Sequence, residues 1–270
     1  AESVFVCIDK TGAPVPVPAE VAAFLLPTLP AAAATTRRVS VHGLELSLDD
    51  RGSGPALLFL HGYPLDGSLW RLQAGAFPVW RTLVPDLRGF GRSDAPDLGY
   101  SMATYADDLA AMLDTLGVDE VVLAGLSMGG YVAFEFIRRH RPRVRALALV
   151  DTRATADSAE GRKGREIAMA DAREGGAPLI AEQMLPKLLA KSAPHALSEK
   201  VREVMAGAPV PGLLGALAAM RDRPDSTDLL AGLKGLPTLV VVGAEDVLTP
   251  PREAEGMAKA IPGAKLAIIP

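Results

Sequence analysis

Cysteine and histidine are scarce in this sequence. It contains one cysteine, Cys7, and four histidines, at positions 42, 61, 140 and 195. A single cysteine excludes a disulfide framework and any zinc site built from several thiolates. Four separated histidines leave little material for a histidine-rich metal site, so we expect neither a metal nor a cofactor.

The sequence also lacks an excess of basic residues and a long apolar run. Lys and Arg total 28 against 32 Asp and Glu, which argues against a nucleic-acid partner because such a surface needs clustered cations. No stretch of about 18 apolar residues occurs, which argues against a membrane partner. The nearest candidate, residues 21–34, contains two prolines and follows Glu20 instead of a basic segment. We therefore expect a cytoplasmic protein.

The chain divides near residue 36. Residues 1–36 carry five prolines and an alanine run, and proline favours extended, loosely held backbone. Within this stretch, residues 4–8 have the pattern of a strand, and residues 5–18 are weakly similar to the tail of hot-dog-fold acyl-CoA thioesterases. We interpret residues 1–36 as a leader or an extra strand, and residues 37–270 as one domain.

Residues 37–270 alternate short apolar segments with helical ones. The pattern predicts strands over 38–42, 44–48, 56–60, 81–85, 120–125, 144–150, 236–243 and 264–269, and helices over 102–116, 131–139 and 252–260. Apolar strands separated by helices indicate an α/β fold, with a mostly parallel sheet and helices on both faces. Strand signals stop between residues 152 and 230, where we expect a helical insertion.

The strongest motif is Gly125-Leu-Ser127-Met-Gly129-Gly130, between a predicted strand and a predicted helix. A serine on such a sharp turn projects above the sheet edge, and the strained backbone requires small flanking residues. The free N–H groups at the start of the next helix point at a developing oxyanion. The motif therefore predicts Ser127 as a nucleophile.

With this motif the sequence resembles the α/β-hydrolase family. The segment His61-Gly-Tyr63-Pro is similar to the family's oxyanion loop. The resemblance implies an oxyanion hole formed by the backbone N–H groups of Tyr63 and Met128, with His61 supporting the loop. Residues 86–93, DLRGFGRS, resemble a D-x-R-G-x-G-x-S turn of the family, which we interpret as structural.

A further match to the family follows a late strand, at residues 241–250. Its position implies Asp246 as the acid of a catalytic triad, where a buried carboxylate would orient an imidazole and stabilise the imidazolium. Asp151, at the end of an earlier strand, and Glu245 are the competing acids.

The histidine of the triad has no counterpart in the sequence. In the family it follows the last strand, and here no histidine occurs after His195. His42 lies in the first hairpin, His140 at a polar helix end and His195 in the insertion. We favour a chain that is shorter than its natural product; a histidine from a partner chain and a non-catalytic relative are the alternatives. An apolar face left by an absent last helix predicts a homodimer.

The resemblance implies a serine carboxylesterase that acts through an acyl-enzyme on Ser127. The insertion, residues 152–230, would form a lid over Ser127. Its apolar residues and the lack of an arginine cluster predict a small to medium uncharged ester as the small-molecule partner. The predicted substrate contacts are Leu65, Leu185, Leu189 and Leu217.

Several related activities share these motifs. Serine as the nucleophile argues against the dehalogenase and epoxide-hydrolase branches, which use an aspartate at that position. The lactonase, thioesterase and perhydrolase branches stay open. The alternative from another class is a relative that binds a small molecule without turnover.

Overall fold

The structure is a computed structural model that describes residues 34–190 and 193–270. The leader strand at residues 4–8 and the thioesterase-like segment at residues 5–18 lie outside the described residues. The strands are β1 (Ala34–Val41), β2 (Leu44–Arg51), β3 (Ala56–Leu60), β4 (Arg81–Pro85), β5 (Val121–Leu126), β6 (Val144–Val150), β7 (Thr238–Gly243) and β8 (Lys265–Ile269).

The helices lie mainly between the parallel strands. The α-helices are α2 (Arg71–Gly75), α3 (Met102–Thr115), α4 (Met128–His140), α5 (Ala159–Leu188), α6 (His195–Ala206), α7 (Val210–Arg221), α8 (Thr227–Leu230) and α9 (Pro251–Ala260). Three short 3₁₀ segments are η1 (Gly67–Trp70), η2 (Arg141–Arg143) and η3 (Ala231–Leu233).

The eight strands form one sheet in the order β1-β2-β4-β3-β5-β6-β7-β8. Strand β2 pairs antiparallel with β1 and β4, and the other neighbours pair in parallel. The predicted mostly parallel α/β sheet is therefore confirmed. Strand β1 begins at Ala34, opposite Arg51, so its ladder starts three residues before the boundary placed at residue 37.

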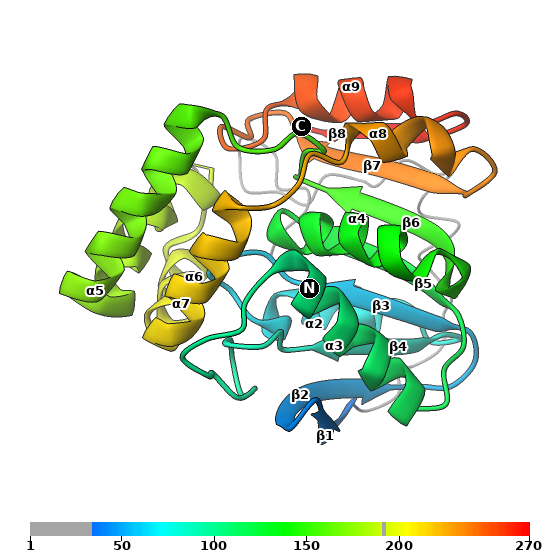
Figure 1. The fold of residues 1–270 in the computed structure, drawn as a ribbon, viewed down its shortest axis with the longest axis horizontal. Coiled ribbons are helices and arrows are strands. Elements are labelled where there is room, and N and C mark those ends of the chain that lie inside the picture. The colour runs from blue at the N-terminus through cyan, green and yellow to red at the C-terminus, as the bar shows by residue number, and fades with distance from the viewer. Residues whose placement is uncertain (1–33, 191–192) are drawn as a thin grey trace.

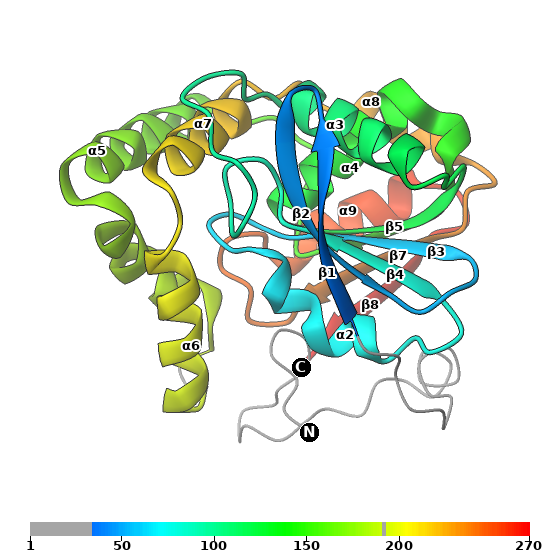
Figure 2. The same cartoon turned by 90° about the horizontal axis from the view of Figure 1, so that it is seen from below.

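Apolar residues pack on both faces of the sheet. Helices α3, α4 and α9 cover one face, and η1 with α2 lies on the other (Figure 2). The larger core joins α3, α4 and α9 to strand residues such as Leu58 and Leu123. The smaller core joins Phe59 and Trp70 to residues of α5 and α6. Successive residues of a strand thus pack alternately into the two cores.

Helices α5, α6 and α7 form a group beside the carboxyl ends of the parallel strands (Figure 1). They fall within residues 152–230, where the sequence predicts a helical insertion. Helix α5 is broken at Gly176, whose φ of 65° is outside the helical range. Pro178 follows this break, because proline is tolerated in the first turn of a helix.

Two surface properties bear on the predicted partners. Leu266 and Ile268 of the edge strand β8 are 38% and 43% exposed, and the homodimer expected through such a surface stays a prediction. Within the described ranges, no single helix is long and apolar enough to cross a membrane. Helices α6 and α7 reach that threshold only as a pair, bent by 92°.

Candidate active site

Ser127 lies in the turn between β5 and α4. Its φ of 51° and ψ of −110° are values that residues with a side chain rarely adopt. The turn is held from the end of β6: the Ser127 N–H donates to the Val150 carbonyl at 2.9 Å, and the Thr152 hydroxyl donates to the Ser127 carbonyl at 2.8 Å. Neighbouring structure thus fixes this strained turn, which is typical of a functional residue.

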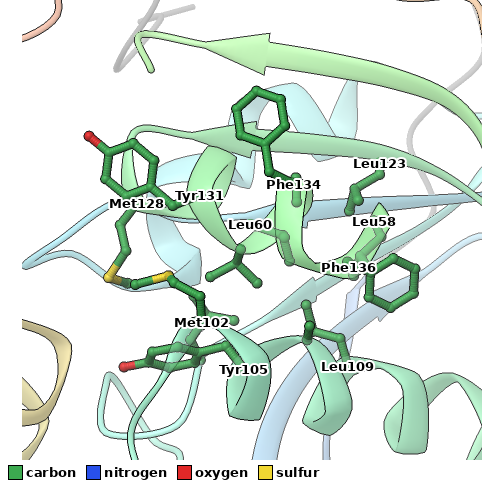
Figure 3. Close-up of a cluster of buried hydrophobic side chains, with 14 of the residues drawn as sticks. Leu58, Leu60, Met102, Tyr105, Leu109, Leu123, Met128, Tyr131, Phe134 and Phe136 are labelled. Carbon is green, nitrogen blue, oxygen red and sulfur yellow. The ribbon is translucent and has the colours of Figure 1, made fainter. Parts of the chain in front are cut away.

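Two glycines allow this turn to pack closely. A Cβ on Gly125 would lie 2.4 Å from the Gly129 carbonyl oxygen, and a Cβ on Gly129 would lie 2.4 Å from the Leu60 oxygen at the end of β3. Beyond the turn, Met128 and Tyr131 of α4 extend into the apolar cluster that α4 shares with the sheet and α3 (Figure 3). The motif therefore seats α4 directly on the sheet.

Helix α4 begins at Met128, three residues before the predicted start at residue 131. Gly129 and Gly130 have low helix propensity, which delays the start that sequence alone predicts. Close packing of the first turn overrides that propensity.

The predicted oxyanion loop runs against this turn. A Cβ on Gly62 would lie 3.3 Å from the Ser127 Cβ, and the Leu65 N–H closes the loop by donating to the Gly62 carbonyl at 2.9 Å. Met128 is the first residue of α4, so its N–H has no acceptor within the helix. The backbone of Tyr63 and of Met128 therefore adjoins Ser127 from two sides.

His61 is fully buried behind the loop. Its Nδ1 lies 3.1 Å from the Gly62 carbonyl oxygen, and its Nε2 accepts the Leu87 N–H at 2.9 Å. This network assigns the proton to Nδ1. Burial lowers the pKa of His61, so the ring is neutral and both nitrogens are occupied. His61 therefore braces the loop.

The remaining histidines lie away from Ser127. Each contacts an acidic residue: His42 with Asp108, His140 with Asp107, and His195 with Glu199. Among the described residues, no histidine lines the cavity that contains Ser127.

The residues of the DLRGFGRS segment are engaged in structural contacts. Asp86 accepts the Gly67 and Arg92 N–H groups, each at 2.9 Å. Arg88 makes two bonds of 2.7 Å to the carboxylate of Asp108, and both side chains are buried. This geometry agrees with the structural interpretation of the turn.

Two carboxylates follow the adjacent strands β6 and β7. Asp151 has a φ of 42° and accepts the Gly243 N–H at 2.9 Å. Burial, reinforced by the nearby carboxylate of Asp246, raises the pKa of Asp151 to about 7. At neutral pH Asp151 is therefore protonated for part of the time.

Asp246 has the better set of donors for an anion. Its Oδ1 accepts the N–H groups of Leu248 at 2.7 Å and Thr249 at 2.9 Å, and its Oδ2 accepts the Thr249 hydroxyl at 2.6 Å. Both Asp246 and Glu245 line the cavity, but Glu245 is exposed. These contacts favour Asp246 over Glu245 as an orienting carboxylate.

A cavity of about 1070 Å³ joins Ser127, Tyr63, Asp151 and Asp246. Its sheet wall includes Tyr63, Leu126 and Ser127, and its helical wall is formed mainly by α5–α7. The predicted substrate contacts Leu65, Leu189 and Leu217 are in the lining. Leu185 is not among the lining residues, because its side chain packs in the smaller apolar core under α5.

The helical wall carries charges that the sequence interpretation missed. The lining includes Arg153, Arg165 and Lys187 as cations and Asp157 and Asp171 as anions. The lining therefore combines the predicted apolar residues with charged residues that were not predicted.

A helical pattern in the sequence could have revealed the two acids, Asp157 and Asp171, but not the three cations. Five lining positions, 157, 161, 164, 168 and 171, recur every three or four residues, which is the spacing of one helix face. Ser158 caps α5 by accepting the Gly161 N–H at 3.2 Å. A serine at this position could therefore have indicated in the sequence where the helix begins.

Comparisons with known proteins were made for the whole chain. The model of the alpha/beta hydrolase fold family matches residues 55–270. AB hydrolase superfamily protein YisY of Bacillus subtilis is 31% identical over 216 residues, covering 77% of this chain and 80% of the relative.

Solved structures give the same result. A thermophilic esterase from Thermogutta terrifontis, described as malate bound, superposes with a TM-score of 0.82 at 42% identity, covering 88% of this chain and 90% of that one. The enol-lactonase from Burkholderia xenovorans LB400 superposes with a TM-score of 0.80 at 27% identity, covering 86% and 91%.

Proposed function

Because this chain belongs to the α/β-hydrolase fold family, we propose that it is a serine esterase acting on small to medium carboxylic esters. The observation that carries the proposal is the strained backbone of Ser127, at φ 51°, facing a cavity of about 1070 Å³. Such strain persists only where the surroundings enforce it, and it is common at catalytic nucleophiles.

The reaction would proceed by acyl transfer. The Ser127 Oγ attacks the ester carbonyl carbon, and the negative charge that develops on the carbonyl oxygen is held by the N–H groups of Tyr63 and Met128. The alcohol leaves when the tetrahedral intermediate collapses, and water then releases the acid from Ser127.

Proton transfer needs a base beside Ser127. Asp246 has the position and the donors to orient an imidazole that takes the Ser127 proton and returns it to the leaving alcohol. The four histidines have other contacts. The proposal therefore assigns the proton transfer to an imidazole group other than those of the four histidines. Imidazole added to the solution should be able to perform the same transfer.

The relatives support an ester substrate. The Thermogutta protein is described as an esterase, and the Burkholderia protein as an enol-lactonase. A lactone is a cyclic ester and is opened by the same acyl transfer, so lactone hydrolysis is the second candidate.

The test combines active-site labelling with turnover. A fluorophosphonate should label Ser127 in a one-to-one ratio, measured by intact mass, and imidazole should accelerate release of 4-nitrophenol from 4-nitrophenyl butyrate. Ser127→Ala should abolish both, whereas Ser68→Ala, at an exposed position outside the cavity lining, should change neither. A folded protein that shows neither labelling nor turnover would overturn the proposal and favour a binding module.

A further inference from the structure

Three charged side chains meet at the base of the helical wall. Asp157 pairs with Arg165 Nε at 3.0 Å and with Arg223 Nη1 at 2.8 Å. One carboxylate is therefore shared by two guanidinium groups, and Asp225 is a further acidic neighbour of Arg223. Asp157 and Arg223 are 5% and 3% exposed, so water screens the pair between them poorly.

Arg223 is held by protein groups through both of its Nη atoms, while its buried Nε has no partner within the described residues. It donates from Nη1 to the Met220 carbonyl at 2.7 Å and from Nη2 to the Thr155 carbonyl at 2.9 Å. Its guanidinium also lies 4.1 Å from the centre of the Tyr131 ring, a cation–π contact. Arg223 is not among the residues that line the cavity, so it is not available to a ligand there.

Arg165 is the member of the cluster that has free donors in the cavity lining. Its side chain lines the cavity and is 24% exposed. Among the described residues its bond to Asp157 uses Nε, and its two Nη groups have no acceptor. A planar pair of N–H donors at a partly dry wall matches the geometry of a carboxylate.

Tyr63 gives an independent indication of a polar ligand. Its side chain lines the same cavity and is 6% exposed, yet its hydroxyl has no partner within the described part of the chain. Burial raises the pKa of Tyr63, and Arg165 acts on the same hydroxyl in the opposite direction. The two side chains are therefore electrostatic neighbours.

We infer that Arg165, assisted by the Tyr63 hydroxyl, binds a carboxylate at the end of the substrate's acyl chain. The inference rests on the proposed ester hydrolysis at Ser127. The backbone of Tyr63 would hold the reacting carbonyl oxygen, and Arg165 lines the same cavity, so we place the far end of the acyl chain at Arg165. The substrate class is thus esters of dicarboxylic acids with one free carboxylate, instead of uncharged esters.

Other acids of the lining leave this position open to an anion. Asp171 lies about 9 Å further along α5 by helical rise and accepts a bond from Gln183 at 2.9 Å. Asp151 and Asp246 lie at the strand ends, and the first of them is protonated up to about neutral pH. Glu245 also lines the cavity, and none of these four acids is paired with Arg165.

The test compares two substrates that differ only in charge. They are 4-nitrophenyl hydrogen adipate and its neutral isostere 4-nitrophenyl adipamate, assayed with imidazole present and the uncatalysed rate subtracted. The ratio of their kcat/KM values should favour the anion and fall about 10- to 100-fold in Arg165→Gln, the range for a hydrogen bond to a charged group. Tyr63→Phe should lower the ratio about fivefold.

The matched control is Lys163→Gln, which removes one positive charge from an exposed position of the same helix and should leave the ratio unchanged. If both variants reduce the ratio equally, the effect is long-range charge and the inference is wrong. If Arg165→Gln does not fold, Arg165→Lys and Tyr63→Phe decide it, because each keeps the bulk of the side chain.

A binding measurement separates this inference from the proposed function. Calorimetric titration of Ser127→Ala with adipate needs no turnover. Adipate binding that disappears in the Ser127→Ala, Arg165→Gln double variant supports the carboxylate site even if no ester is hydrolysed, in which case only the proposed function fails. Hydrolysis of both esters at equal rates without adipate binding overturns the inference and leaves the esterase proposal intact.

Discussion

The sheet wall and the helical wall of the cavity are held by different interactions. At the sheet wall, main chain packs on main chain: Gly129 comes so close to the Leu60 carbonyl that no side chain fits between them. At the helical wall, side chains make the contacts: apolar residues pack between α5 and α7, and the ion cluster of Asp157, Arg165 and Arg223 joins the segments at their ends. The first wall sets where Ser127 lies, and the second sets which chemical groups face it.

Breaking the buried ion cluster should have the largest effect on stability. Asp157→Asn leaves Arg223 buried without its counter-charge, a change that costs about 4 kcal/mol in such pairs. We expect a corresponding drop in the free energy of unfolding by urea denaturation. The control Asp222→Asn removes an exposed pair with Arg221 and should cost about 0.5 kcal/mol. Similar losses in the two variants would mean that the cluster contributes little to the helical wall.

Introducing one methyl group at the sheet wall should rank second. Gly129→Ala places a Cβ 2.4 Å from a backbone oxygen that cannot rotate away. We expect a loss of about 3 kcal/mol and slower fluorophosphonate labelling of Ser127, because the turn must shift. Unchanged stability and labelling would show that this wall is more compliant than its contacts indicate.

The acid pair at the strand ends makes stability depend on pH. Folding raises the pKa of Asp151 to about 7, so the folded state prefers the protonated form. Stability is therefore highest at low pH with respect to this group, and it falls as the pH rises through about 7. From about pH 5.5 to about pH 8 the loss should be about 2 kcal/mol.

Asp151→Asn should remove that dependence, since an amide keeps the acceptor for the Gly243 N–H and does not ionise. Thermal unfolding followed across the pH range compares the variant with the parent chain. The assigned pKa shift would be contradicted if the parent chain became more stable over this pH interval and the variant showed the same pH dependence.

A Gly→Ala substitution on the helical wall should change the stability in the opposite direction from Gly129→Ala. Gly164 lies inside α5, and an added Cβ would meet no atom within 4 Å. Gly164→Ala should therefore stabilise the protein by about 0.5–1 kcal/mol, through helix propensity alone. A destabilisation comparable to that of Gly129→Ala would erase the contrast between the two walls.

Much of the secondary structure was predictable because it depends on short segments. Strand β3 is a run of five apolar residues, Ala56–Leu60, and all five are buried, as expected of an inner parallel strand. The sequence did not predict that β4 lies between β2 and β3, because strand order depends on pairings between distant segments. It also placed Leu185 in the substrate lining, since apolar periodicity does not distinguish a core-facing leucine from a cavity-facing one.

The sequence alone determined the turn that carries Ser127. Ser127, its flanking glycines and the strand and helix around it are contiguous, so local backbone geometry and the alternation of apolar and small residues are enough to identify the turn. Only the tertiary structure decided what surrounds it. Asp151 meets the loop of Asp246 because β6 and β7 are neighbours. Arg165 lines the cavity, and Asp157, with which it pairs, is also held by Arg223, 66 residues further along the chain than Asp157. Contacts over such separations depend on the packing of whole elements, which no local pattern encodes.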